Sequence, residues 1–224
     1  MNEPVSSAIK AATYYFPSAG KHNLDATVEL ACSRAQDLGV RHLLVFIGDG
    51  QGAFKASERL AGTSISVVAV TFPFGQRFIS GDKPEERTVV RARTSDRQFL
   101  RELENKGIRV VQGTMPFQSV ILPGTTDSKL AAVQATLRLL SEGMSLCVQA
   151  TLMATDAGVV EEGEEVVAMA ADTAIVACGA MSQWMFHPRH GFEIREVICK
   201  PRTRFASNDP RGEDAGVGQT EPTL

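Results

Sequence analysis

Helix-length and strand-length apolar segments alternate along much of this 224-residue chain. The first helix is predicted at residues 24–38, where apolar residues recur at a spacing of three to four between Asn23, a candidate cap, and Gly39, a candidate stop. Residues 42–47 then form a short run that is apolar after its histidine, as expected of a parallel strand covered by helices on both faces. This order of segments predicts an α/β fold.

The alternation continues through the middle of the chain. Ser95, with Gln98 three residues later, matches a capping box and predicts the start of a third helix. A fourth helix is predicted between Asp127 and Gly143, with Leu130, Val133, Leu137 and Leu140 on one face. The remaining elements predicted here are a helix after residues 48–52 and strands at residues 66–70, 109–112 and 144–148.

Beyond Gly158 the pattern changes to three apolar segments, at residues 166–169, 173–178 and 193–199. No helix-length interval separates the first two, which predicts an antiparallel edge or hairpin on an otherwise parallel sheet.

The segment at residues 71–94 is longer than an ordinary connection between two elements. This basic segment could close over an anionic ligand as a flap, or it could form a surface hairpin in which Phe78 and Ile79 pair with Val89 and Val90. The polar end of the chain shows no apolar periodicity. We therefore expect an N-terminal extension at residues 1–22, one domain at residues 23–203 and a disordered tail at residues 204–224.

Composition excludes several classes of protein. The net charge of −3 is spread over both signs, so no nucleic-acid or membrane partner is expected. The four cysteines lie far apart without a C-x-x-C pair, which argues against a zinc site or a disulfide framework. Neither a signal peptide nor a membrane-length apolar stretch is recognisable, so a cytoplasmic location is expected.

The glycine-rich turn at residues 48–53 joins a predicted buried strand to a helix N-terminus, where backbone N–H groups and the helix dipole favour a phosphate. The turn also fits G-x-G-x-x-A, but the second strand ends without the acidic residue that would hold a ribose, so NAD is disfavoured. The alternative is a tight strand-to-helix turn without a ligand.

Other candidate groups carry weaker signals. His187 and His190 flank a proline and have no third metal ligand nearby, so a metal site is not expected. Residues 151–158 follow a predicted strand end, where Asp156 could cap a turn or contact a ligand. Cys147 lies in an apolar segment and is interpreted as an inert buried thiol.

Several stretches resemble, in order, the stand-alone pyruvate kinase C-terminal domain-like proteins of archaea and bacteria. They are residues 23–30, 39–45, 70–75, 151–158, 171–176 and 193–202. The resemblance implies a three-layer α/β/α sandwich, with a mostly parallel sheet and an antiparallel edge. It also implies a phosphorylated ligand, such as flavin mononucleotide (FMN), at the turn after the first strand.

The chain departs from that family at the turn itself. Where the relatives tend to place hydroxyl residues for the phosphate, this chain has Gly48 and Gly52, so only backbone N–H groups remain. These 224 residues leave no room for the catalytic barrel of pyruvate kinase, so a complete pyruvate kinase is not expected.

The resulting hypothesis is a protein that binds a small phosphorylated molecule, FMN-like or a sugar phosphate, at the strand ends. The alternatives are a structural or regulatory protein that has lost the ligand, and a flavin-dependent enzyme for which no catalytic residue is identified. A homo-oligomer is possible. The predicted ligand-binding residues are Gly48, Asp49, Gly50, Gln51, Gly52, Ala53, Thr71, Thr114, Thr151 and Asp156.

Overall fold

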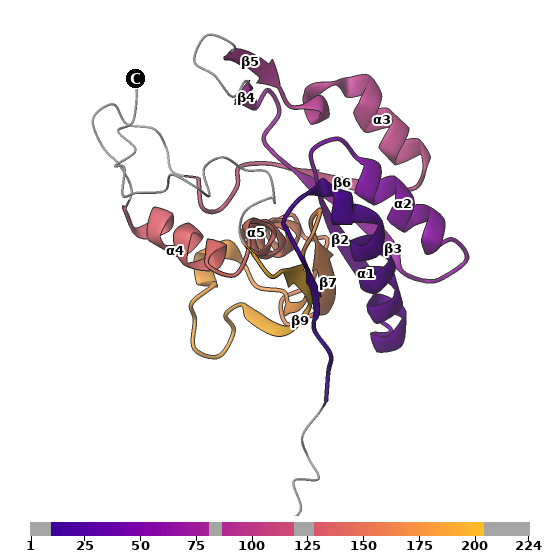
Figure 1. Cartoon of the computed structure of the whole chain (residues 1–224), viewed down its shortest axis with the longest axis vertical. Helices are drawn as coiled ribbons and strands as arrows, with labels where there is room; N and C mark the ends of the chain where they lie inside the picture. Colours follow the sequence, from indigo (N-terminus) through magenta and orange to yellow (C-terminus); the bar gives the residue numbers. More distant parts are fainter. Residues whose placement is uncertain (1–9, 81–86, 119–127, 204–224) are drawn as a thin grey trace, which may run out of the picture.

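A seven-stranded sheet forms the middle layer of the protein, in a computed structural model that describes residues 10–80, 87–118 and 128–203 (Figure 1). The strand order is β1-β9-β8-β7-β2-β3-β6. The strands are β1 (Tyr14–Phe16), β2 (His42–Ile47), β3 (Ser66–Thr71), β6 (Arg109–Gln112), β7 (Glu165–Met169), β8 (Ala174–Cys178) and β9 (Glu193–Pro201).

The sheet is mixed but mostly parallel. β2 pairs in parallel with β3 and β7, and β3 pairs in parallel with β6. β8 runs antiparallel to both of its neighbours, β7 and β9, and β1 then pairs in parallel with β9. The antiparallel pairing predicted for the last segments is confirmed, and β1 covers its outer side with a strand from the predicted N-terminal extension.

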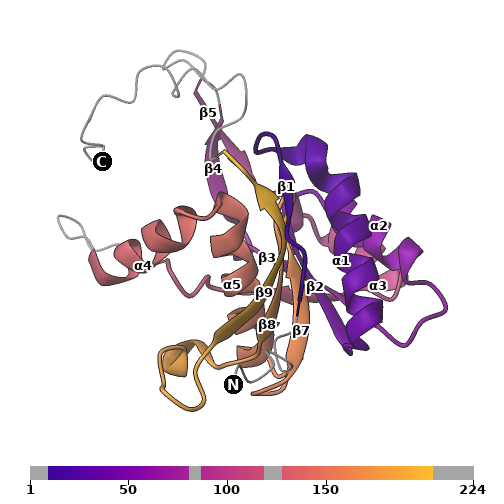
Figure 2. The same ribbon diagram turned by 60° about the horizontal axis from the view of Figure 1, so that its bottom comes forward.

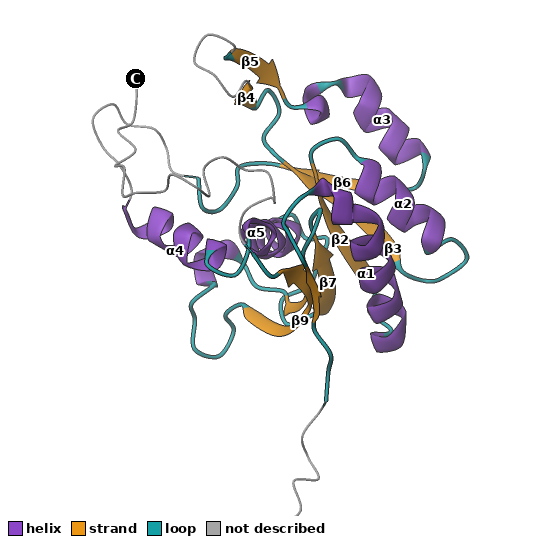
Figure 3. Ribbon diagram, viewed as in Figure 1, coloured by secondary structure: helices purple, strands orange, loops and turns teal. Residues whose placement is uncertain are grey.

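Helices cover both faces of the sheet, as Figures 2 and 3 show. One face carries α1 (Leu24–Leu38), α2 (Gln51–Arg59) and α3 (Arg97–Asn105). The other carries α4 (Ser128–Arg138) and α5 (Glu142–Asp156). Short 3-10 turns are η1 (Lys21–Asn23), η3 (Arg93–Ser95) and η4 (Ser182–Trp184). This arrangement confirms the three-layer α/β/α sandwich.

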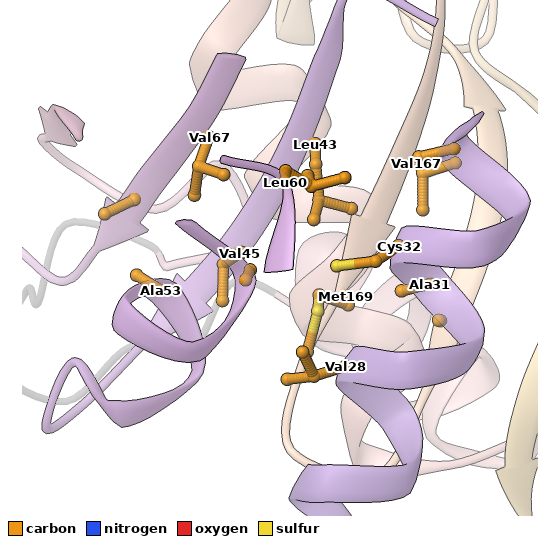
Figure 4. Close-up of a cluster of buried hydrophobic side chains, with 14 of the residues drawn as sticks. Val28, Ala31, Cys32, Leu43, Val45, Ala53, Leu60, Val67, Val167 and Met169 are labelled. Atoms are coloured by element: carbon orange, nitrogen blue, oxygen red, sulfur yellow. The ribbon is translucent and has the colours of Figure 1, made fainter. Parts of the chain in front are cut away.

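The core consists of two apolar clusters, one on each face of the sheet. Successive strand residues point to opposite faces, so Leu43 and Val45 of β2 join the α1 side whereas Leu44 and Phe46 join the α5 side. Figure 4 shows the first cluster, in which Cys32 and its neighbours on α1 pack against β2 and β7. Because both faces are buried, β2 needs a continuous apolar run, which is the pattern seen in the sequence.

The strand predicted at residues 144–148 is wrong, because these residues lie in α5. This helix packs between the sheet and α4, and its residues from Gly143 to Thr155 are almost all buried. A helix that is apolar on all sides has no amphipathic period, so a five-residue stretch of it resembles a strand. Gly143, predicted to follow the fourth helix, instead lies in the first turn of α5, whereas α4 ends at Arg138.

The predicted helix caps differ from the observed ones. The third helix is capped by Asp96, whose side chain accepts a hydrogen bond from the backbone N–H of Gln98 at 2.9 Å. Ser95 instead accepts from the backbone N–H of Gly75 at 2.9 Å and fixes the preceding loop. Asn23 occupies the cap position of α1, but its side-chain amide donates to the carbonyl of Ser18.

The basic segment after β3 forms the predicted surface hairpin, β4 (Arg77–Ser80) and β5 (Thr88–Arg91). Phe78 pairs with Val90 and Ile79 pairs with Val89 in an antiparallel register. The disordered tail predicted for residues 204–224 lies outside the described residues.

Candidate functional site

A cavity of about 320 Å³ lies at the carboxyl ends of β2 and β7. Its walls come from η1, the first turn of α1, the end of β2, the glycine-rich turn and the residues after β7. Most of the lining is apolar, and the charged side chains in it are one lysine and one aspartate. The lining residues are Lys21, Leu24, Val45, Phe46, Ile47, Gly48, Asp49, Gly52, Ala170 and Ala171.

Close packing leaves little or no room for a side chain at two glycines of the turn. Gly50 has a left-handed backbone with a φ of 82°, and a Cβ placed there would lie 2.5 Å from the Phe99 ring. At Gly52 a Cβ would lie 3.2 Å from Val45 and 3.3 Å from Leu24. Neighbouring side chains therefore hold the turn against the sheet, and the start of α2 faces the cavity.

The first turn of α2 presents backbone donors. In the described part of the chain, no group accepts a hydrogen bond from the N–H of Gly52 or of Ala53. The N–H of Gln51 is used, because it donates to the Asp49 carboxylate at 3.1 Å. Free N–H groups at a helix N-terminus, together with the helix dipole, favour an anionic ligand.

Two basic side chains flank the turn. The ammonium group of Lys21 forms an ion pair with the Asp49 carboxylate. On the other side, the Arg93 guanidinium lies 4.4 Å from the centre of the Phe99 ring and 3.5 Å from the Asp49 carbonyl oxygen, to which it donates. Burial alone would raise the pKa of Asp49, but Lys21, the N–H of Gln51 and Arg93 together lower that pKa below its ordinary value.

Of the predicted residues 48–53, Gly48, Asp49 and Gly52 line this cavity, whereas the other three and the predicted threonines do not. Thr71 is buried, and its hydroxyl interacts with the carbonyl of Ile47 at 2.9 Å and with Thr94 at 3.0 Å, so it is not free to bind a ligand. Thr114 is exposed in the loop after β6, at the same edge of the sheet, but does not line the cavity.

The assignment of Thr151 and Asp156 to the strand ends is wrong, because both lie in α5. Thr151 is fully buried and donates to the carbonyl of Cys147 at 3.1 Å. Asp156, in the last turn, accepts from the backbone N–H of Ser182 at 2.9 Å. The first turn of α5 lies beside Thr173, near the cavity. Because a 15-residue helix is about 22 Å long, Asp156 in the last turn lies at the opposite edge of the sheet.

Lys21 was not predicted as a site residue, and neither were Ala170 and Ala171. A single lysine in a turn carries no sequence pattern that distinguishes it from an ordinary surface lysine. Its position depends on a long-range contact, because the neighbouring Gly20 N–H donates to the Asp172 carboxylate at 2.8 Å. That bond holds the chain before α1 across the end of the sheet.

The other sequence candidates do not form a second site. Cys147 is fully buried, and burial, with a smaller effect of nearby negative charge, raises the pKa of its thiol well above the ordinary value. The rings of His187 and His190 stack at 5.1 Å, but the described residues contain no group of three side chains able to hold a metal ion. No helix in the described ranges has both the length and the apolar character needed to cross a membrane.

Fold and cavity together define a three-layer α/β protein with a candidate anion site at the carboxyl edge of its sheet. No family model matches the chain. The similar solved structures include a pyruvate kinase of Cryptosporidium parvum, at 14% identity and a TM-score of 0.33, over 70% of this chain and 22% of the enzyme. Another is a Cryptosporidium parvum pyruvate kinase in complex with ADP, at 16% identity and a TM-score of 0.31, over 66% and 20%.

The chain thus spans about a fifth of the length of the pyruvate kinases that it matches. The structural neighbours are pyruvate kinases, but a likeness at this level assigns neither a family nor an activity to this chain. Membership of a stand-alone family stays a prediction.

Proposed function

We propose that this chain binds a small phosphorylated molecule in the cavity at the ends of β2 and β7. The observation that carries the proposal is the combination of the Gly52 N–H, for which the described part of the chain offers no acceptor, with the ammonium group of Lys21, since both residues line the cavity. A phosphate placed there would accept hydrogen bonds from the helix start and would be charge-balanced by Lys21.

The size and lining of the cavity narrow the choice of ligand. Ligand sites range from about 300 to 1,000 Å³, so this cavity suits a sugar phosphate or a mononucleotide better than a dinucleotide. The apolar walls at Leu24, Val45 and Ala170 would contact the uncharged part of the ligand. FMN is a candidate because it combines one phosphate with an apolar ring, although its ring would find few hydrogen-bonding side chains in this lining.

Binding would require the Lys21–Asp49 ion pair to rearrange. Asp49 already accepts from the N–H of Gln51, so its carboxylate would repel an incoming phosphate unless Lys21 turned toward the ligand. The same observation favours the second candidate function, a structural or regulatory protein without a ligand, since Asp49 itself supplies a negative charge at the start of α2. A flavin-dependent enzyme is the remaining alternative, and no residue of the cavity is assigned a catalytic role in it.

Native mass spectrometry with an absorbance scan of freshly purified protein tests the proposal. We expect a stoichiometric phosphorylated molecule, yellow if it is FMN, and its loss in Gly50→Val. We also expect titrations with FMN and with sugar phosphates to show binding that Lys21→Gln weakens about tenfold, the effect of roughly 1.4 kcal/mol of lost interaction.

The matched control is Lys55→Gln, because Lys55 is another partly exposed lysine in an ion pair, with Asp25, and does not line the cavity. Equal affinities of the Lys21 and Lys55 variants would contradict the assigned site. A protein that is empty when purified and ignores all added phosphorylated compounds would leave the structural or regulatory role.

A further inference from the structure

A second surface, on the opposite face of the sheet from α1 and α2, exposes large apolar side chains. The segment from η4 to the start of β9 lies beside α4 in Figures 1 and 2. In this segment Phe186 is 73% exposed and Trp184 is 50% exposed. Such side chains cost free energy when they are left in water, and their clustering marks an interaction surface.

A groove of about 530 Å³ runs between this segment and α4. One wall is α4, through Ala132 and Leu137, and the other includes Phe186 and Ile194. The nine lining residues are all uncharged. The nearby Arg138, at the end of α4, is already paired with Glu142 at 2.9 Å.

The absence of charge in the lining favours a second copy of this chain as the occupant. A two-fold symmetric contact places the same surface on both sides, so a charged centre would face like charge across the axis. An uncharged groove avoids that repulsion. The groove lining, by contrast, has no charged side chain that could pair with an acidic or a basic partner.

The exposed area is compatible with a dimer contact. An aromatic side chain carries about 150–250 Å² of surface, so Trp184 and Phe186 together expose roughly 250 Å² at the stated fractions. A standard interface buries about 800 Å² on each partner, so these two rings supply roughly a third of it. The walls of the groove on α4 and β9 add further apolar area.

We propose that the chain forms a two-fold symmetric dimer through this surface, with Phe186 of each protomer packed against α4 of the other. The contact lies away from the cavity at the glycine-rich turn, so dimer formation and ligand binding are separable properties. The proposal therefore does not depend on the proposed function.

Sedimentation velocity over a range of protein concentrations tests it. Wild-type protein is expected to shift, as concentration rises, from the mass of one 24.1 kDa chain to twice that mass. Ala132→Arg and Ala132→Glu each place a charge in the apolar groove where Phe186 of the other protomer would pack, and each variant is expected to remain monomeric.

Phe186→Ser is expected to raise the dimer dissociation constant about a hundredfold, because the contact is made twice. Phe74→Ser is the matched control, since Phe74 is another largely exposed phenylalanine, at 54%, which follows β3 in the chain, does not line the groove and should leave the constant unchanged. A wild type that stays monomeric, or dimers that persist in both Ala132 variants, would each overturn the proposal.

Discussion

Replacing Gly50 by alanine tests whether the glycine-rich turn is held by packing or only by its backbone conformation. Gly62 provides an internal reference, because its φ of 81° nearly equals the 82° of Gly50. A Cβ at Gly62 would meet no atom within 4 Å, whereas at Gly50 it would lie 2.5 Å from the Phe99 ring. The two substitutions therefore share the backbone cost and differ in the contact with Phe99.

The expected magnitudes follow from these contacts. A left-handed conformation costs an L-residue about 1–2 kcal/mol, so Gly62→Ala should lower the free energy of unfolding by about that amount. Overpacking adds about 1–3 kcal/mol, because Phe99 is 2% exposed and its ring has little room to move. Gly50→Ala is therefore expected to lower the free energy of unfolding by about 2–5 kcal/mol.

Urea unfolding with a constant m-value measures both effects. The same substitution in a Phe99→Leu background should lose most of the excess, which gives a coupling energy of about 1–3 kcal/mol between the two positions. Equal destabilisation by Gly50→Ala and Gly62→Ala, with no coupling to Phe99, would refute the reasoning that the ring fixes this turn.

Two further predictions concern buried ionisable groups. Burial alone would raise the pKa of Glu164, but the N–H of Glu161, His42 and Arg41 together lower this pKa. The ionised Glu164 carboxylate therefore stabilises the fold above its unfolded pKa of about 4.3, and this stabilisation is lost as the pH falls through the lower folded pKa. Glu164→Gln should therefore cost about 1–3 kcal/mol in urea unfolding at pH 7 and progressively less below about pH 4, whereas a cost that does not change with pH would contradict this origin. Burial raises the pKa values of Cys32 and Cys199 to about 11, and Cys147 is fully buried. Ellman's reagent at pH 8 should modify these thiols only after unfolding, and rapid labelling of the folded protein would show that this core opens.

Periodicity in the sequence predicted most of the sandwich, because the elements concerned are either amphipathic or completely apolar. The helix Leu24–Leu38 and the strand His42–Ile47 agree with the structure residue for residue. The β4–β5 hairpin was also predicted, since apolar pairs bounded by charged residues can pair in only a few registers.

The failure at α5 had the largest effect on the candidate site. The helix Glu142–Asp156 is buried between the sheet and α4, so polar residues mark no outer face and its first half resembled a strand. That interpretation moved Thr151 and Asp156 to the wrong edge of the sheet. Thr71 does not line the cavity for a different reason. A buried hydroxyl must be satisfied, and the carbonyl of Ile47 and the hydroxyl of Thr94 already do so.

The sequence by itself determined the layers, the order of most elements and the position of the glycine-rich turn after the first long strand. These properties depend on local patterns of apolar residues and glycines, which are read within one turn of helix or a few residues of strand. The tertiary structure alone decided which side chains share the cavity. Lys21 reaches Asp49 across 28 residues of sequence, and Gly20 is held by Asp172 across 152, and contacts at such separations leave no local pattern.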